Sequence, residues 1–166
     1  MFLIRHAQAA HNVNDDFSIF DPELTAVGIQ QAKSFDHSSI QEIKTVVCST
    51  SNRAIQTAMY MFPDHQIMAT DLALEYNTGI PCNSRHELSI SKVKYPQVDF
   101  HTLFVDPLQT ERYKQQGLDR AKRLLSTVSG LSRPIAIVTH LNFMREVAEI
   151  VGKRREVVHN CGIIEL

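Results

Sequence analysis

The sequence predicts an α/β protein, a three-layer α/β/α sandwich with a mainly parallel central sheet. Short apolar runs rich in β-branched residues lie at Val46–Cys48 and Ile135–Val138, and each ends in small polar residues before a helical pattern begins. The run Phe2–Ile4 has the same character. Such runs are typical of buried strands. Strands that alternate with helices favour a parallel sheet that is covered by helices.

Four helices are predicted because apolar or small residues recur at spacings of three and four. They cover Thr25–Phe35, Asn52–Met61, Glu111–Ser129 and Asn142–Val151. Thr25 and Ser51 stand directly before two of these patterns, where a side-chain oxygen can accept hydrogen bonds from the first turn of a helix. We expect both residues to be N-caps.

The segment Tyr76–Pro107 differs from the rest of the chain. It contains three of the six prolines and has poor periodicity. We therefore expect an excursion bounded by turns that could cover a site. No internal repeat, low-complexity tract or linker-like change in composition is present, so residues 1–166 are expected to form one domain.

Composition excludes several classes of protein. The apolar share is 43%, the charged share is 21% and the formal net charge is -1, so there is no overall attraction to nucleic acid or to a membrane surface. The three cysteines show no CxxC spacing, which favours a reducing compartment. No signal-peptide core and no run of about 18 apolar residues is found. We expect a cytoplasmic protein that does not bind membranes.

Three segments of the chain bring cationic or imidazole side chains to the ends of predicted strands. They are Arg5–His6, Ser49–Arg53 and Thr139–His140. The carboxyl ends of parallel strands meet at the edge where ligands bind in α/β proteins. A guanidinium offers paired donors that match phosphate oxygens and stays charged, so Arg5 and Arg53 suit a phosphoryl group, although a carboxylate would fit nearly as well. Arg53 also lies in a first helical turn, whose N–H groups favour an anion.

His6 is the candidate nucleophile of this edge. An ordinary imidazole pKa of about 6.5 leaves much of the side chain neutral near pH 7, with one ring nitrogen free to attack phosphorus. The other ring nitrogen then needs an acceptor, for which a backbone carbonyl is suitable.

Two other chemistries are conceivable. His6, His140 and Glu75 could supply the two imidazoles and one carboxylate of some zinc sites. The nearby arginines would repel a metal cation, so no metal or other cofactor is expected. Cys48 lies inside an apolar strand pattern, where a thiol is normally inert.

The chain resembles the histidine phosphatase superfamily, the group that includes cofactor-dependent phosphoglycerate mutases and many small phosphatases. The resemblance rests on five ordered motifs, Leu3–Ala7, Leu24–Ala32, Cys48–Ala58, Leu74–Glu75 and Val138–His140. It implies a phosphoglycerate mutase-like fold. The branch of acid phosphatases and phytases has an Asp after its second histidine, whereas His140 is followed by Leu141, so the mutase-like branch is the more similar one.

The resemblance also implies roles for individual residues. His6 would become phosphohistidine, while Arg5, Arg53 and His140 would bind the phosphoryl oxygens, in agreement with the electrostatic argument. Glu75 matches the acidic residue that protonates the departing oxygen and later takes a proton from the attacking water.

Further substrate contacts are expected from Gln8 and Asn12, which stand at positions of the family motif, and from Arg85, which could hold a second acidic group of the substrate. Ala7 and Leu141 stand where the family usually has glycine, and Leu141 could narrow the pocket or give it an apolar wall.

Two residues of the motifs are expected to brace the pocket instead. They are Thr57 and Gly28, a glycine that is costly inside a helix by about 1 kcal/mol and therefore indicates close packing.

A phosphatase is the favoured function, because family mutases typically have longer insertions after the acidic residue. The substrate would be a phosphorylated small molecule or a phosphorylated protein side chain, including phosphohistidine. A mutase-type phosphotransferase and a noncatalytic phosphoprotein-binding module of the same fold remain open at this point. Nothing in the sequence assigns an oligomeric state.

Overall fold

Six strands form one sheet at the centre of the molecule. The computed structural model describes residues 1–40, 42–76, 79–106, 117–154 and 157–166. The strand order is β4-β3-β2-β5-β1-β6. Only the pair of β1 and β6 is antiparallel among the pairs of this sheet within the described residues. The strands are β1 (Phe2–Arg5), β2 (Thr45–Ser49), β3 (Ile67–Thr70), β4 (Val98–Asp99), β5 (Ile135–Thr139) and β6 (Ile163–Glu165).

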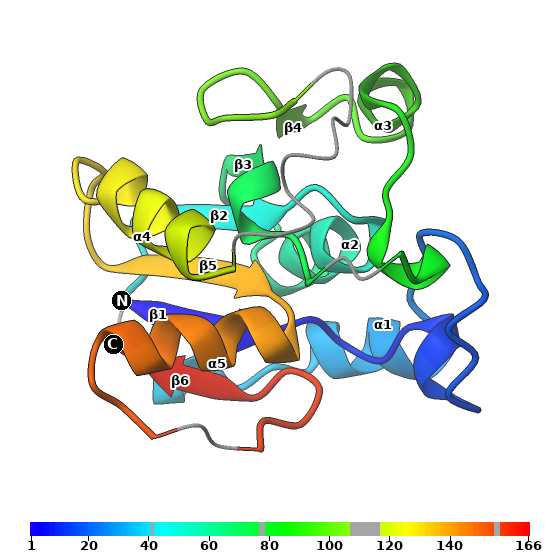
Figure 1. Cartoon of the computed structure of the whole chain (residues 1–166), viewed down its shortest axis with the longest axis horizontal. Coiled ribbons are helices and arrows are strands. Elements are labelled where there is room, and N and C mark those ends of the chain that lie inside the picture. Colours follow the sequence, from blue (N-terminus) through cyan, green and yellow to red (C-terminus); the bar gives the residue numbers. More distant parts are fainter. Residues whose placement is uncertain (41, 77–78, 107–116, 155–156) are drawn as a thin grey trace.

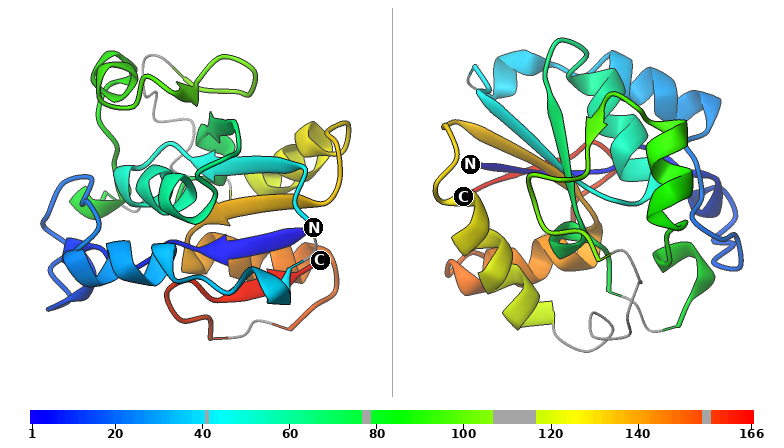
Figure 2. Two further views of the ribbon diagram at one scale, coloured as in Figure 1. Left: turned by 180° about the vertical axis from the view of Figure 1, so that it is seen from behind. Right: turned by 90° about the horizontal axis from the view of Figure 1, so that it is seen from above.

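Helices cover both faces of the sheet, which confirms the predicted three-layer architecture. The view from above separates α1 and α2 on one face from α4 and α5 on the other (Figures 1 and 2). α3 lies beside β4 at one end of the sheet (Figure 1). The helices are α1 (Ala26–Lys33), α2 (Asn52–Met61), α3 (Leu88–Lys94), α4 (Gly117–Val128) and α5 (Leu141–Ile150).

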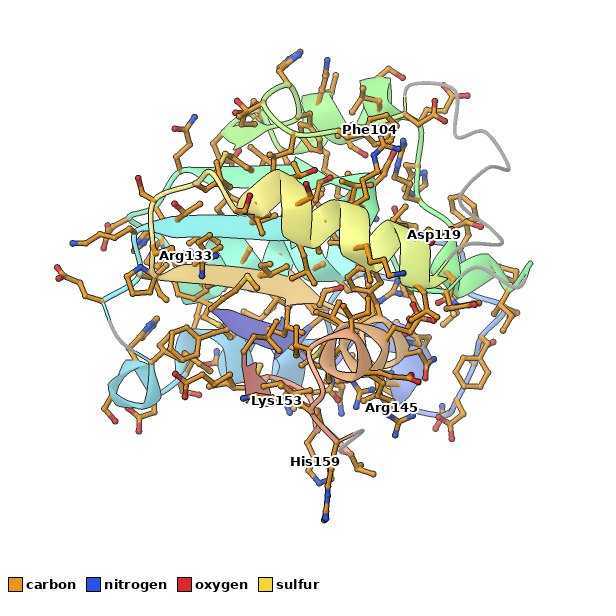
Figure 3. The ribbon with its side chains drawn as sticks, turned by 60° about the vertical axis from the view of Figure 1, so that its left-hand side comes forward. Phe104, Asp119, Arg133, Arg145, Lys153 and His159 are labelled. Carbon is orange, nitrogen blue, oxygen red and sulfur yellow. The ribbon has the colours of Figure 1, made fainter. Side chains whose placement is uncertain are left out.

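Successive residues of the central strands point to opposite faces of the sheet, and both faces are buried, which explains why these strand sequences are continuously apolar. In β1, Phe2 and Ile4 belong to the core beneath α2, whereas Leu3 belongs to the core beneath α4 and α5. The central strands β2 and β5 divide their residues in the same way. A strand that is buried on both faces has no polar positions to alternate with, so its sequence is a plain apolar run. The loop residue Phe104 lies beside α4 (Figure 3), with the Arg123 guanidinium 4.5 Å from its ring centre.

The two predicted helix caps have different outcomes. Thr25 is confirmed as the N-cap of α1, since its hydroxyl accepts a hydrogen bond from the Gly28 N–H at 3.0 Å. Ser51 occupies the N-cap position of α2, but the prediction that its side chain caps the helix is wrong. The Asp21 carboxylate accepts the Asn52 N–H at 2.9 Å instead. The Ser51 hydroxyl lies 3.3 Å from Nε2 of His140.

Several elements were not predicted from the sequence. They are β3, β6, α3 and the two-residue strand β4; the last two lie in the segment that was expected to be an irregular excursion. The helix predicted at Glu111–Ser129 is confirmed from Gly117 onward, while its first six positions and Pro107 lie outside the described residues. No helix in the described ranges combines the length and the apolar character needed to cross a membrane.

The carboxyl ends of β1, β2 and β5 lie at one edge of the sheet. β5 is paired in register with both neighbours, with Arg5 opposite Thr139 and Cys48 opposite Val138. The segment before β6 continues along the end of β1, where the Arg5 N–H donates to the Gly162 carbonyl at 2.9 Å. The two chain ends lie side by side at the opposite edge (Figures 1 and 2).

Candidate active site

His6 follows β1 directly and is fixed by its own backbone. Its N–H donates to the Thr139 carbonyl at 2.9 Å, and its carbonyl accepts from Nδ2 of Asn160 at 2.8 Å. The side chain is only 3% exposed, and Nδ1 lies 2.8 Å from the Ala7 carbonyl oxygen. A carbonyl can only accept, so Nδ1 carries the hydrogen and Nε2 is unprotonated. The expected backbone acceptor for His6 is thereby found.

Arg53 lies against the free nitrogen of His6. Its Nε is 3.3 Å from Nε2 of His6, and its Nη1 donates to the Cys82 carbonyl at 2.7 Å. The guanidinium is 1% exposed. Burial and, next, the Arg53 charge hold the pKa of His6 well below its usual value. His6 is therefore neutral over the ordinary pH range.

His140, at the end of β5, faces His6 with 5.2 Å between the ring centres. Its Nε2 lies 2.9 Å from the Ser49 hydroxyl. Its Nδ1 is buried and has no hydrogen-bond partner among the described residues. Burial and then the Arg53 charge also lower the pKa of His140 well below its usual value.

Arg5 is held from the far end of the chain. Its Nη1 donates to the Val158 carbonyl at 2.8 Å, while its Nε is buried without a partner in the part of the chain that the structure describes. Arg5, His6, Arg53 and His140 thus meet at one edge, as the sequence predicts. We call these four residues the phosphate pocket, after the role that the sequence predicts for them. Two of its buried polar atoms, one on Arg5 and one on His140, have no hydrogen-bond partner within the described residues.

Glu75 lies at the start of α5. Its Oε1 accepts from the N–H groups of Tyr76 at 2.9 Å and Phe143 at 3.1 Å, and its Oε2 accepts from Asn142 at 3.1 Å. These contacts place the carboxylate at the positive end of the α5 dipole. The helix N-termini at this edge therefore hold protein carboxylates, Glu75 on α5 and Asp21 on α2.

A buried arginine that the sequence analysis missed supports this acidic residue. Arg120 of α4 donates from Nη2 to the Leu74 carbonyl at 2.7 Å, and its guanidinium lies 5.0 Å from the centre of the Phe143 ring. The sequence feature that could have indicated its burial is its position four residues before Leu124, on the apolar face of the helix.

The predicted substrate residues are placed differently from one another. Oε1 of Gln8 accepts the Thr25 hydroxyl at 2.7 Å, and Oδ1 of Asn12 accepts the Ala9 N–H at 3.1 Å, so both side chains also order the loop after His6. Leu141 is the first residue of α5, is half-buried and packs against the core under α4 and α5.

The structure contradicts the expectation that Arg85 holds a second acidic group of the substrate. It is 3% exposed, and its guanidinium pairs with Asp71 through Nε at 2.8 Å and Nη2 at 2.9 Å. Nη2 also donates to the Asp106 carbonyl at 2.6 Å, and Nη1 donates to the His86 carbonyl at 2.7 Å. These contacts join three segments of the chain, and they leave Arg85 unsuited to hold a substrate group.

The two bracing residues of the motifs behave as expected. A Cβ on Gly28 would lie 1.9 Å from the Gln8 carbonyl oxygen, which confirms close packing. The Thr57 hydroxyl accepts the Ala7 N–H at 3.0 Å and donates to the Arg53 carbonyl at 2.6 Å, so it joins the two halves of the pocket. Ala7 itself is fully buried.

The alternative chemistries find little geometric support. Within the described residues, no group of three or more His, Cys, Asp and Glu side chains is arranged to hold a metal ion. Cys48 is fully buried, and burial raises the pKa of its thiol.

Comparison with known proteins identifies the family. The model of the histidine phosphatase superfamily (branch 1) matches residues 1–163. The chain belongs to this superfamily. A phosphoglycerate mutase-like protein from Arabidopsis thaliana is 22% identical to this histidine phosphatase superfamily member over 202 residues, which cover 91% of the chain and 74% of the relative.

Solved structures confirm the phosphoglycerate mutase-like fold. A phosphoserine phosphatase mutant from Entamoeba histolytica, in complex with phosphoserine, matches with a TM-score of 0.66 and 18% identity over 98% of this chain and 87% of its own. The alpha-ribazole phosphatase from Shigella flexneri gives 0.65 and 22%, with coverages of 98% and 87%. The Bombyx mori ecdysone phosphate phosphatase, in complex with tungstate, gives 0.70 and 15%, with coverages of 98% and 86%.

Proposed function

We propose that this protein is a phosphatase that hydrolyses a phosphomonoester, or a phosphoramidate such as phosphohistidine, through a phosphohistidine intermediate on His6. One observation carries the proposal: a neutral imidazole presents its unprotonated Nε2 beside the Arg53 guanidinium in a buried pocket. An enzyme nucleophile needs a free electron pair, and phosphoryl transfer needs fixed positive charge around the phosphorus.

The first step is the attack of Nε2 of His6 on phosphorus. The N–P bond forms while the bond from phosphorus to the leaving oxygen breaks, and the leaving oxygen takes a proton from Glu75. Arg5, Arg53 and His140 stabilise the charge on the three remaining phosphoryl oxygens. Nε of Arg5 and Nδ1 of His140, which have no partner in the described part of the chain, supply donors for this purpose.

The second step returns the enzyme to its starting state. A water molecule attacks the phosphorus, Glu75 takes a proton from the water, and the N–P bond breaks to release inorganic phosphate. Glu75 therefore enters the first step protonated and regains its proton in the second. A carboxylate has about four lone-pair sites, and three of them accept backbone N–H groups here. One site on Oε2 is left to carry the proton in transit.

Small phosphorylated molecules are the favoured substrates. Three solved structures of the same fold are a phosphoserine phosphatase, an alpha-ribazole phosphatase and an ecdysone phosphate phosphatase, and all three names describe phosphomonoesters of small molecules. No step of this mechanism needs a metal ion, since the pocket's own arginines provide the positive charge.

The test is phosphate release from a panel of phosphometabolites and a phosphohistidine peptide, measured with a metal chelator present. We expect the native protein to turn over at least one substrate, and His6→Ala to lose more than about 10³-fold of that rate. The matched control is His101→Ala, a change of an exposed histidine outside the pocket. Phosphate from a radiolabelled substrate that stays bound to the native protein in base and is released in acid would identify the phosphohistidine intermediate.

Three outcomes would contradict the proposal. Undiminished activity of folded His6→Ala would exclude His6 as the nucleophile. Loss of activity in chelator would indicate a metal enzyme. Silence of the native protein across the panel, with phosphate still bound, would favour a noncatalytic module or a mutase that needs a primer phosphate.

A further inference from the structure

A third imidazole lies beside His6 and has no part in the mechanism above. It belongs to His11, in the short 3-10 helix Ala10–Asn12. The ring centres of His6 and His11 are 5.7 Å apart, close to the 5.2 Å between His6 and His140. His11 is 6% exposed. The His6 ring thus has two buried imidazoles at similar distances from it, and only His140 belongs to the recognised motifs.

The hydrogen bonds of Asn12 determine where the His11 ring carries its hydrogen. The Ala9 N–H can only donate, so the Asn12 atom 3.1 Å away is the amide oxygen. The amide nitrogen of Asn12 then lies 3.0 Å from Nε2 of His11 and donates to it. Nε2 of His11 is therefore an acceptor, and a neutral ring must carry its hydrogen on Nδ1. Burial, followed by the charges of Arg53 and Arg5, lowers the pKa of His11 to about 4, which keeps the ring neutral.

The Nδ1–H of His11 is a buried donor with no partner among the residues that the structure describes. Burying a donor without an acceptor is costly, so native proteins nearly always provide one. The Phe17 ring, 6.3 Å from His11, offers no lone pair. The charges that act on His11 are the cations Arg5 and Arg53, which exclude a cationic ligand and favour an anion. An anionic oxygen is therefore the acceptor that best suits this position.

We propose that His11 is a third imidazole of the phosphate pocket, and that its Nδ1–H donates to an oxygen of the bound phosphoryl group while Asn12 holds the required tautomer. This inference rests on the proposed function. It adds to the pocket a donor that remains neutral, so it binds a phosphoryl oxygen without adding a further positive charge beside His6. It also makes Asn12 a positioning residue that fixes the tautomer of His11, in addition to any direct contact of Asn12 with substrate.

The first test uses inorganic phosphate as the probe and needs no variant. In the native protein with ¹⁵N-labelled histidine, NMR should show His11 with a protonated Nδ1 and an unprotonated Nε2, and phosphate should shift the Nδ1–H proton resonance downfield. A protonated Nε2 on His11, or an Nδ1–H resonance that does not respond to saturating phosphate, would overturn the inference.

The second test compares phosphate affinity by calorimetry in three variants. His11→Phe keeps a ring of similar shape but removes the donor, and it should weaken binding roughly 10- to 100-fold. His11→Asn places an amide N–H near the position of Nδ1 and should restore affinity to within about fivefold of the native value. His37→Phe is the matched control: this histidine packs against Phe35 and Phe62, which are not pocket residues, and its loss should leave affinity unchanged.

These measurements separate this inference from the phosphatase proposal. If native affinity persists in His11→Phe while His6-dependent hydrolysis is present, His11 has no such role and the phosphatase proposal stands. If phosphate binds through His11 but no substrate is hydrolysed, the His11 contact is supported and the phosphatase proposal fails. If His11→Asn binds phosphate as weakly as His11→Phe, the donor at Nδ1 is not what His11 contributes and the inference is overturned.

Discussion

Nε of Arg53 lies 3.3 Å from Nε2 of His6 and donates a hydrogen bond to it. In the free protein this bond orients the imidazole and occupies its lone pair. In the proposed mechanism, the same lone pair attacks phosphorus when a phosphoryl group arrives, and the guanidinium turns its donor to a phosphoryl oxygen. The resting contact therefore favours the neutral, oriented imidazole of His6, which the proposed mechanism requires of its nucleophile.

Arg53→Lys should lower kcat/KM by roughly 10- to 100-fold, since a hydrogen bond from a charged donor is worth about 1.5–3 kcal/mol. A compact ammonium cannot serve both His6 and the Cys82 carbonyl as the planar guanidinium does. The measurement is steady-state phosphate release. Arg133→Lys is the control, because this exposed arginine lies at the opposite end of β5 (Figure 3). Equal rates for native protein and Arg53→Lys would remove Arg53 from the mechanism.

Glu75→Gln should affect substrates according to their leaving groups. An alkyl phosphate needs a proton on its departing oxygen, so kcat/KM should fall by about 10²-fold or more, while nitrophenyl phosphate should lose less than about tenfold. The parameter kcat/KM reports the first chemical step, so the comparison is free of the later hydrolysis step. Glu149→Gln changes an exposed carboxylate at the other end of α5 and serves as control. The same loss for both substrates would argue against proton donation by Glu75.

Gly28→Ala should destabilise the protein by about 3 kcal/mol or more, because the new methyl group would lie 1.9 Å from the Gln8 carbonyl oxygen. For a chain of this size the melting temperature should fall by roughly 6–12 °C. Gly130→Ala is the matched control, since a Cβ there meets nothing within 4 Å. If thermal unfolding showed the same melting temperature for both variants, the close contact of α1 with the loop after His6 would be disproved.

Stability should fall as the pH is lowered below about 6.5. Burial lowers the pKa values of His6, His11 and His140 in the folded protein, that of His11 to about 4. Unfolded histidines titrate near 6.5, so between about pH 4 and 6.5 the unfolded state binds more protons and acid favours unfolding. Thermal unfolding from pH 7.5 to 5 measures this slope.

His11→Phe should make the dependence of stability on pH shallower, because one of the three contributing groups is removed. The raised pKa of buried Asp21 acts in the opposite direction, since its carboxyl binds a proton more readily in the folded state. That effect is confined to the more acidic range where carboxyl groups titrate. A melting temperature that is constant from pH 7.5 to 5 would contradict this account.

Local patterns were sufficient to predict the centre of the fold and the meeting of the four residues that follow or flank its strands at one edge. β1, β2 and β5 are buried on both faces, so their sequences are plain apolar runs, and parallel neighbours necessarily end at one edge. The residues that follow these strands could therefore be grouped from the amino-acid sequence alone. β4 has only two residues and carries no periodicity, and β3 includes Met68 and Ala69, which have weak strand preference.

Contacts between distant segments could not be predicted from one sequence. Asp21 caps a helix that begins 31 residues later, and Arg85 pairs with Asp71 from another turn. In each case the fold brings a partner to a buried charged residue from a distant part of the sequence. The local sequence around Asp21 or Arg85 gives no indication of which residue that partner is. His11 was missed for a related reason, since the role proposed for it depends on the position of its ring relative to His6.

The segment before β6, which includes Val158 and Asn160, completes the surroundings of His6 only late in synthesis of the chain. His6 leaves the ribosome well ahead of the residues that hold it, because its carbonyl is bound by Asn160 and the neighbouring Arg5 by Val158, more than 150 positions later. A nascent chain that lacks these late residues can still bind the His6 N–H through Thr139, but the His6 carbonyl and the Arg5 guanidinium have lost the partners described here. Catalytic competence should therefore appear abruptly once this segment has been synthesised, and fragments cut short before Val158 should bind phosphate poorly even where the rest of the sheet has formed.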